Sequence, residues 1–251
     1  MRYRATVEYD GTDFAGFQVQ PGRRTVQGEL QAALARLDPT GSSRTQAAGR
    51  TDAGVHASGQ LIAFSYHGMM SAAELGSALD ALLPVDVSIG RLDRVAEGFD
   101  PRRAAWYREY RYTVWNGPRS PLLERYALGV RDPLDVAAMA EAGSVLVGRH
   151  DFSAFGAADR SPVRTVHAVR VARRGRVVTI DVTADAFLRG MVRRIVAVLI
   201  EVGRGRWATE QVAAALAAGR PALDGATAPP QGLCLRRVVL GRSGQDAGDD
   251  G

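Results

Sequence analysis

Lysine is absent from this chain of 251 residues, so all 32 basic side chains are arginines. A nucleotide-binding P-loop needs a lysine, and that class of site is therefore excluded. Cysteine occurs only at Cys234, which excludes an internal disulfide and favours a reducing compartment, the cytoplasm. The sequence contains no run of 18 apolar residues, and Met1–Arg4 does not open a secretory signal, so we expect no membrane segment.

Histidine is also scarce. The four histidines and one cysteine show no metal-ligand spacing, so we expect no metal site. Arginine is unevenly distributed. Residues 1–103 hold 11 Arg and 12 acids, a net charge of −1, whereas residues 104–242 hold 21 Arg and 12 acids, a net charge of +9. This excess is typical of a phosphate-binding surface, although a solvated basic surface would give the same count.

Periodicity predicts an α+β chain. Expected strands cover Arg2–Tyr9, Arg44–Arg50, Gln60–Tyr66, Val85–Val95, Trp106–Trp115, Val166–Ala172, Val177–Thr183 and Leu233–Leu240. Expected helices begin after Thr25, at a capping box Ser71–Glu74, at Asp132, at Arg189 and at Thr209. Both halves show the order strand, helix, two strands, helix, strand. We therefore expect an α+β domain at 1–103, a basic α+β domain at 104–240 and a disordered tail at 241–251.

The densest motif is Gly49–Ala57, which reads Gly-Arg-Thr-Asp-Ala-Gly-Val-His-Ala. It places Asp52 in a glycine-flanked loop between two expected strands, where a carboxylate can be exposed. Arg50, two residues away, could pair with Asp52 and keep it ionised, as a nucleophile must be. The same residues are also explained by an ordinary turn, with His56 as a local hydrogen-bonding group. The spacing alone favours that interpretation.

The motif resembles the catalytic signature of the TruA-type tRNA pseudouridine synthases. Further blocks follow in the order of that family: Tyr9–Gln20, Phe99–Arg103 with small departures, Tyr110–Tyr112, Asp151–Phe155 and Ala186–Arg193. The likeness covers nearly the whole chain, and six ordered blocks are far more specific than one motif. The resemblance implies two similar RNA-recognition-like α+β domains, whose antiparallel sheets meet at a central catalytic cleft.

The resemblance also implies the chemistry. Uridines 38 to 40 in the anticodon arm of tRNA would be isomerised to pseudouridine without a cofactor, by a homodimer. Asp52 is implied as the nucleophile, or as the carboxylate that drives glycosidic cleavage. Tyr110 is implied to stack on the target uracil, Arg193 to pair with the carboxylate, and Arg50 to flank it. Tyr112 is expected to be a packing residue on the opposite face of its strand.

Two rival functions remain open at the level of sequence. A catalytically silent RNA-binding module on the same scaffold would show a similar basic surface, although Asp52 and Tyr110 are both present. A metal-dependent nuclease is disfavoured, because the sequence lacks a cluster of carboxylates or histidines.

Overall fold

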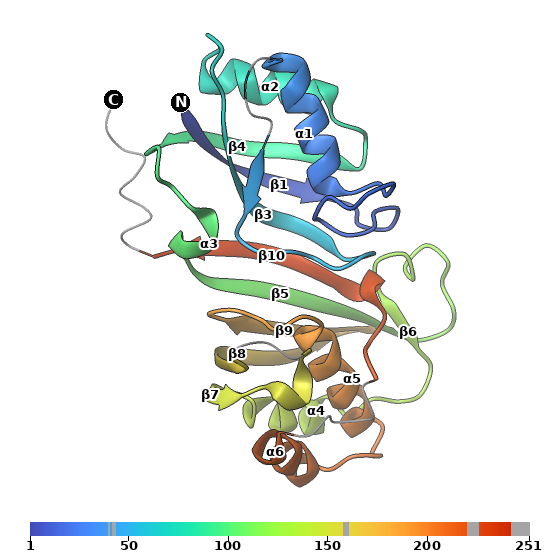
Figure 1. The fold of residues 1–251 in the computed structure, drawn as a ribbon. Coiled ribbons are helices and arrows are strands. Elements are labelled where there is room, and N and C mark those ends of the chain that lie inside the picture. The colour runs from blue at the N-terminus through green and yellow to red at the C-terminus, as the bar shows by residue number, and fades with distance from the viewer. Residues whose placement is uncertain (40, 42–43, 158–160, 220–225, 242–251) are drawn as a thin grey trace. The chain divides into compact units, whose positions relative to one another are not determined.

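The structure is a computed structural model, which describes residues 1–39, 41, 44–157, 161–219 and 226–241. The chain divides into two compact units (Figure 1). Unit 1 comprises Met1–Trp106 together with the chain from Leu235 onward, and unit 2 comprises Tyr107–Cys234. The last strand is thus grouped mainly with unit 1, whereas the sequence pattern grouped residues 104–240 together. Residues 242–251 of the expected tail lie outside the described residues.

Unit 1 contains an antiparallel sheet with the strand order β4-β1-β3-β10, and β2 also pairs with β3. Its elements are β1 Arg2–Tyr9, α1 Val26–Leu37, β2 Thr45–Ala47, β3 His56–Ser65, α2 Ala72–Leu82, β4 Val87–Val95, α3 Pro101–Ala104 and β10 Leu233–Leu240. Strand β1 pairs with β3 so that Tyr9 lies opposite Ala57. This register brings the end of β1 to the beginning of β3, where the Asp52 loop ends.

Unit 2 contains the strand order β5-β9-β8-β7, and the short strand β6 runs parallel to β5. Its elements are β5 Ala105–Asn116, β6 Leu128–Val130, α4 Val136–Ser144, β7 Gly148–Asp151, β8 Val163–Arg174, β9 Val177–Ala184, α5 Met191–Gly203 and α6 Thr209–Ala218, with single 3-10 turns at Ser153–Phe155 and Pro230–Gly232. Strands β8 and β9 form a hairpin whose turn contains Gly175 at a φ of 60°. The mixed composition of both units confirms the α+β prediction.

Local capping chemistry explains where the two longer helices of unit 1, α1 and α2, begin. The Thr25 hydroxyl accepts a hydrogen bond from the Gly28 amide at 3.2 Å, which caps α1. Ser71 and Glu74 form the predicted capping box before α2. The apolar face of α1, led by Leu30 and Leu34, is buried. Both helix starts were therefore predictable from neighbouring residues alone.

Two predicted helix starts were wrong, and two short strands were missed. Helix α4 begins at Val136 and is capped by Asp135, whose carboxylate accepts from the Ala138 amide, rather than at Asp132. Helix α5 begins at Met191 because Gly190 has a φ of 73° and interrupts the helix before it. Arg189 thus does not share a helical face with Arg193. The short strands β6 and β7 were not expected.

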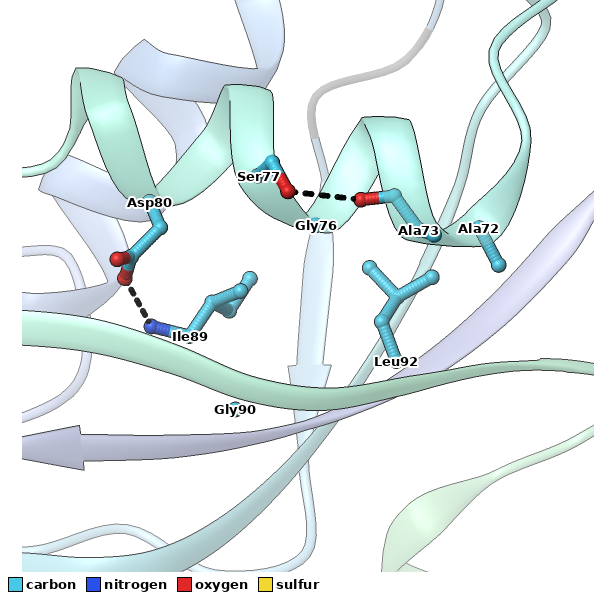
Figure 2. A pocket seen from close by; sticks show the side chains of 8 residues that line it. All are labelled: Ala72, Ala73, Gly76, Ser77, Asp80, Ile89, Gly90 and Leu92. Carbon is cyan, nitrogen blue, oxygen red and sulfur yellow. Dashed lines mark hydrogen bonds between the residues drawn. The ribbon is translucent and has the colours of Figure 1, made fainter.

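A groove of about 270 Å³ lies between α2 and β4 in unit 1 (Figure 2). In this groove the Asp80 carboxylate accepts from the Ile89 amide at 2.9 Å, which ties the helix to the strand. The lining is mostly small and includes Gly76 and Gly90. None of the residues singled out from the sequence lines this groove, so we treat it as a feature of the fold.

Candidate active site

The Asp52 loop connects β2 to β3 and forms a tight turn. The Val55 amide donates to the Asp52 carbonyl at 3.2 Å, and Gly54 has a φ of 75°. Thr51, directly before Asp52, is buried, whereas Asp52 itself is half-buried. The loop is therefore a turn, as the ordinary interpretation required. Its carboxylate nevertheless remains partly accessible, as a reacting group requires.

A second segment, residues 10–17, packs along this loop. The Phe17 amide donates to the Thr51 carbonyl at 3.1 Å, and the Gly54 amide donates to the Phe14 carbonyl at 3.3 Å. Gly16 has a φ of 98° and leaves room for Thr51, since a Cβ atom there would lie 2.9 Å from the Thr51 carbonyl oxygen. The Tyr9–Gln20 block and the Asp52 motif, far apart in sequence, thus form one local structure.

Gly11 permits the closest of these approaches. A Cβ atom on Gly11 would lie 2.0 Å from the Val55 carbonyl oxygen, which no real side chain can occupy. The Gly11 amide also donates to Nδ1 of His56 at 3.0 Å. The same nitrogen lies 3.1 Å from Oδ1 of Asp10. His56 therefore accepts from Gly11 when Nδ1 carries no proton, and can donate to Asp10 when it does.

Arg24 links residues 10–17 to Asp86, which directly precedes β4. Its Nη1 and Nη2 atoms donate to the two Asp86 carboxylate oxygens at 2.7 and 2.8 Å. These bonds hold the pKa of Asp86 below its ordinary value. The Arg24 guanidinium carbon also lies 4.1 Å from the centre of the Phe14 ring. The segment that braces the Asp52 loop is therefore itself anchored.

Arg50 does not form the ion pair that its spacing suggested. Its side chain is exposed, and within the described part of the chain it makes no ion pair with Asp52. Arg50 and Asp52 nevertheless belong to the same short loop of unit 1. A guanidinium held there without a carboxylate partner is available to a phosphate.

Tyr110 and Tyr112 both lie on β5 in unit 2. Residues two apart on a strand share a face, so the expectation of opposite faces was wrong. Both rings are buried, and Tyr110 packs edge-on against Phe187 at a ring-centre distance of 5.1 Å. The Tyr112 hydroxyl donates to the Pro229 carbonyl at 2.8 Å. Burial raises the pKa of Tyr112 well above its ordinary value, so this hydroxyl remains a donor.

Arg193 lies in the first turn of α5 and holds the segment Thr227–Ala228. Its Nε donates to the Ala228 carbonyl at 2.6 Å, while the Ala228 amide donates back to the Arg193 carbonyl at 3.0 Å. Tyr112 holds the adjacent Pro229, so both side chains fix one stretch of chain. The structure thus places Asp52 and Arg50 in unit 1, and Tyr110 and Arg193 in unit 2.

Comparison with known proteins decides the family. A family model described as tRNA pseudouridine synthase matches residues 5–101 and 142–239. The tRNA pseudouridine synthase A of Geobacter sulfurreducens is 44% identical, over 92% of this chain and 96% of that protein. The tRNA pseudouridine synthase A of Moorella thermoacetica is 46% identical, over 94% and 98%. This chain belongs to the tRNA pseudouridine synthase family.

Membership in the tRNA pseudouridine synthase family confirms the resemblance carried by the sequence blocks. Asp52, Arg50 and Arg193 lie within the matched segments, whereas Tyr110 lies between them. The full-length relatives cover nearly all of the chain. Among the described residues, no three His, Cys, Asp or Glu side chains are grouped as metal ligands. Within the same residues, no helix has both the length and the apolar composition to cross a membrane.

The β8–β9 hairpin of unit 2 is strongly basic. Residues 163–184 carry five arginines and one acid, a net charge of +4. That acid, Asp181, is already engaged by Arg111, whose Nε and Nη2 donate to it at 2.7 and 2.9 Å. Hydrogen bonding to Asp181 raises the pKa of Arg111. Arg170, Arg174 and Arg176 are exposed, and no carboxylate among the described residues pairs with them.

Proposed function

We propose that this protein isomerises uridine to pseudouridine in tRNA, at positions 38 to 40 of the anticodon arm. The observation that carries the proposal is the half-buried Asp52 in a braced loop, within a near full-length likeness to tRNA pseudouridine synthases. The reaction breaks the bond from uracil N1 to ribose C1′ and forms a bond from C5 to C1′. The C5 proton is released and N1 acquires one, so the reaction consumes neither an oxidant nor water.

The residues divide this work by their chemistry. The Asp52 carboxylate serves the glycosidic carbon, either as a nucleophile or by promoting cleavage of the bond. The Tyr110 ring offers a flat apolar face, which holds a base while the base turns in its own plane. The target uridine must leave the helical stack to react, at a cost that the protein repays through backbone contacts. Arg50 and Arg193 are the cationic groups proposed to hold the flipped nucleotide.

The proposal is tested with a tRNA transcript that carries uridine only at position 39 of its anticodon arm. We expect pseudouridine to appear at that nucleotide and nowhere else, as measured by nucleoside analysis after digestion. A matched transcript with cytidine at positions 38 to 40 provides the control. Tight binding of the transcript without any pseudouridine would favour the silent RNA-binding module instead. The proposed substrate places the enzyme in the cytoplasm, and the homodimer implied by the family resemblance remains a prediction.

Binding of tRNA is expected to depend steeply on salt, and the hairpin arginines to supply part of that dependence. Each phosphate contact contributes roughly −0.7 to −0.9 to the slope of log affinity against log salt concentration. Replacing Arg170, Arg174 and Arg176 by alanine removes three guanidiniums, so the slope should become shallower by about 2 to 3 units. Affinity measured from 50 to 300 mM salt gives both slopes.

A matched variant removes the same charge elsewhere. Arg23, Arg36 and Arg94 are exposed on unit 1, and their triple replacement by alanine should change the slope much less. Equal slopes for the two triple variants would show that net charge alone, rather than contact at the hairpin, governs binding.

The two tyrosines are expected to separate catalysis from stability. Tyr110→Phe keeps the ring but loses the hydroxyl that could relay the C5 proton, so turnover should stall after glycosidic cleavage. Tyr112→Phe loses the bond to Pro229, which should cost about 1 kcal/mol of stability and little activity. Single-turnover rates and melting curves of both variants measure these effects. A rate defect confined to Tyr112→Phe would show that Tyr112, rather than Tyr110, acts on the substrate.

A further inference from the structure

Three buried polar side chains meet beneath the Asp52 loop. Tyr9 ends β1, Thr51 precedes Asp52 in the loop, and Gln60 lies within β3. Their exposed fractions are 3%, 6% and 0%. Polar groups are costly to bury unless they bond to one another, and apolar residues would fill this space at lower cost. Three such side chains gathered at the base of one loop therefore call for a function other than packing.

The hydrogen bonds of these side chains lead to both sides of the loop. The hydroxyl oxygens of Tyr9 and Thr51 lie 2.8 Å apart. The Gln60 amide nitrogen donates to the Gly49 carbonyl at 2.9 Å and approaches the Tyr9 hydroxyl at 3.5 Å. The Gln60 carbonyl oxygen accepts from the Leu61 amide at 3.2 Å, which fixes the orientation of the carboxamide. Gln60 therefore acts as a donor toward both the loop and Tyr9.

The Tyr9 oxygen accepts from Gln60 and also shares a hydrogen bond with the Thr51 hydroxyl, in which either oxygen can be the donor. The chain of bonds then runs from β3 through β1 to the residue immediately before Asp52. No side chain crowds Gly49, since a Cβ atom there would meet nothing within 4 Å. Its bond from Gln60 is thus a principal restraint on that side of the loop.

We propose that Tyr9, Thr51 and Gln60 are positioning residues, which hold Gly49 and Thr51 in place and thereby fix the Asp52 carboxylate. This inference rests on the proposed function, because it assumes that Asp52 is the reacting group. A carboxylate must meet the glycosidic carbon within a narrow geometry, and a displacement of about 1 Å can cost roughly 100-fold in rate. The three side chains act through the loop backbone and do not need to touch the substrate.

The chain offers matched substitutions for the test. Tyr9→Phe and Thr51→Val each remove one hydroxyl and preserve the volume of the side chain. Thr51→Ser keeps the hydroxyl and should rescue the function that Thr51→Val loses. Tyr3→Phe is the control for Tyr9, because Tyr3 lies on the same strand, is equally buried at 3%, and donates its hydroxyl to the Met1 sulfur at 3.8 Å rather than to the Asp52 loop.

The expected effect is on turnover rather than on binding. Tyr9→Phe and Thr51→Val should lower the rate at saturating tRNA by about 10- to 100-fold, with the tRNA dissociation constant within two-fold of wild type. Thr51→Ser and Tyr3→Phe should stay within two-fold in both measurements. Wild-type rates for Tyr9→Phe and Thr51→Val would overturn the proposal. It would equally be overturned by rate losses that follow only the folded fraction in melting curves.

A second measurement does not depend on catalysis. Amide hydrogen exchange of residues 49–55 should be faster in Tyr9→Phe and Thr51→Val than in wild type, and unchanged in Tyr3→Phe. Unchanged exchange in all the variants would reject the positioning role even if rates fell. If the wild-type protein forms no pseudouridine while exchange is still faster in the two variants, the restraint on the loop is supported and the proposed function is rejected. The two failures are therefore distinguishable.

Discussion

Asp52→Asn is expected to abolish pseudouridine formation while binding tRNA within a few-fold of wild type. The amide nearly matches the carboxylate in shape, but it can act neither as a nucleophile nor as a base. The turn is closed by a backbone bond, from the Val55 amide to the Asp52 carbonyl, which the substitution leaves in place. The loop should therefore keep its form. Loss of a group that acts on the reacting carbon should lower the rate by more than about 10³-fold.

The measurement pairs product formation with equilibrium binding for the purified variant. Asp80→Asn is the matched control, since Asp80 lies in the same unit and bonds to the Ile89 amide in the groove of Figure 2. An asparagine oxygen there can still accept that bond, so activity should persist. Appreciable turnover in Asp52→Asn would show that Asp52 is not the reacting group.

Gly11→Ala is expected to have the second largest effect. Its new methyl carbon would lie 2.0 Å from the Val55 carbonyl oxygen, and the obstacle is backbone, which cannot rotate away. Either the Asp52 loop or residues 10–17 must move. Overpacking of this kind costs about 1 to 3 kcal/mol, and displacement of the loop should cost roughly 100-fold in rate. We expect turnover to fall much more than tRNA affinity.

Rate, affinity and melting temperature should be measured together for Gly11→Ala. Stability loss of this size shifts the melting temperature of a chain this long by roughly 2 to 12 °C. Gly98→Ala provides the control, because a Cβ atom there meets nothing within 4 Å and its backbone needs no unusual φ. A Gly11→Ala enzyme with wild-type turnover would show that the loop tolerates displacement and that its bracing is not required.

The helix caps and the Asp52 motif could be predicted because each is determined by residues a few positions apart in the sequence. Thr25 and Ser71 cap their helices by accepting from amides only three residues away, so the sequence alone is enough to predict both caps. The start of α4 could not be predicted in the same way. Asp132 and Asp135 both suit a cap, but Asp132 instead contacts Arg204 at 3.0 Å, a partner distant in sequence. Residue type left two candidates, and a tertiary contact decided between them.

The candidate site shows the same division. Asp52 was evident from its motif, yet nothing in the motif shows that Gly11 touches Val55 or that Tyr9 bonds to Thr51. These contacts depend on the pairing of β1 with β3, which spans about 50 residues of sequence. A glutamine among apolar strand residues, Gln60, was the one available signal. Short strands such as β7, with four residues, are too brief to show a period.

Release of the uracil C5 proton tests the central claim most directly. A prefolded tRNA transcript labelled with tritium at C5 of its uridines is incubated with enzyme in the presence of a chelator and without cofactors. We predict that tritium enters the solvent in step with pseudouridine at positions 38 to 40, and that Asp52→Asn releases none. Undiminished release by Asp52→Asn, or no release by the wild-type enzyme from a transcript that it binds, would contradict the account.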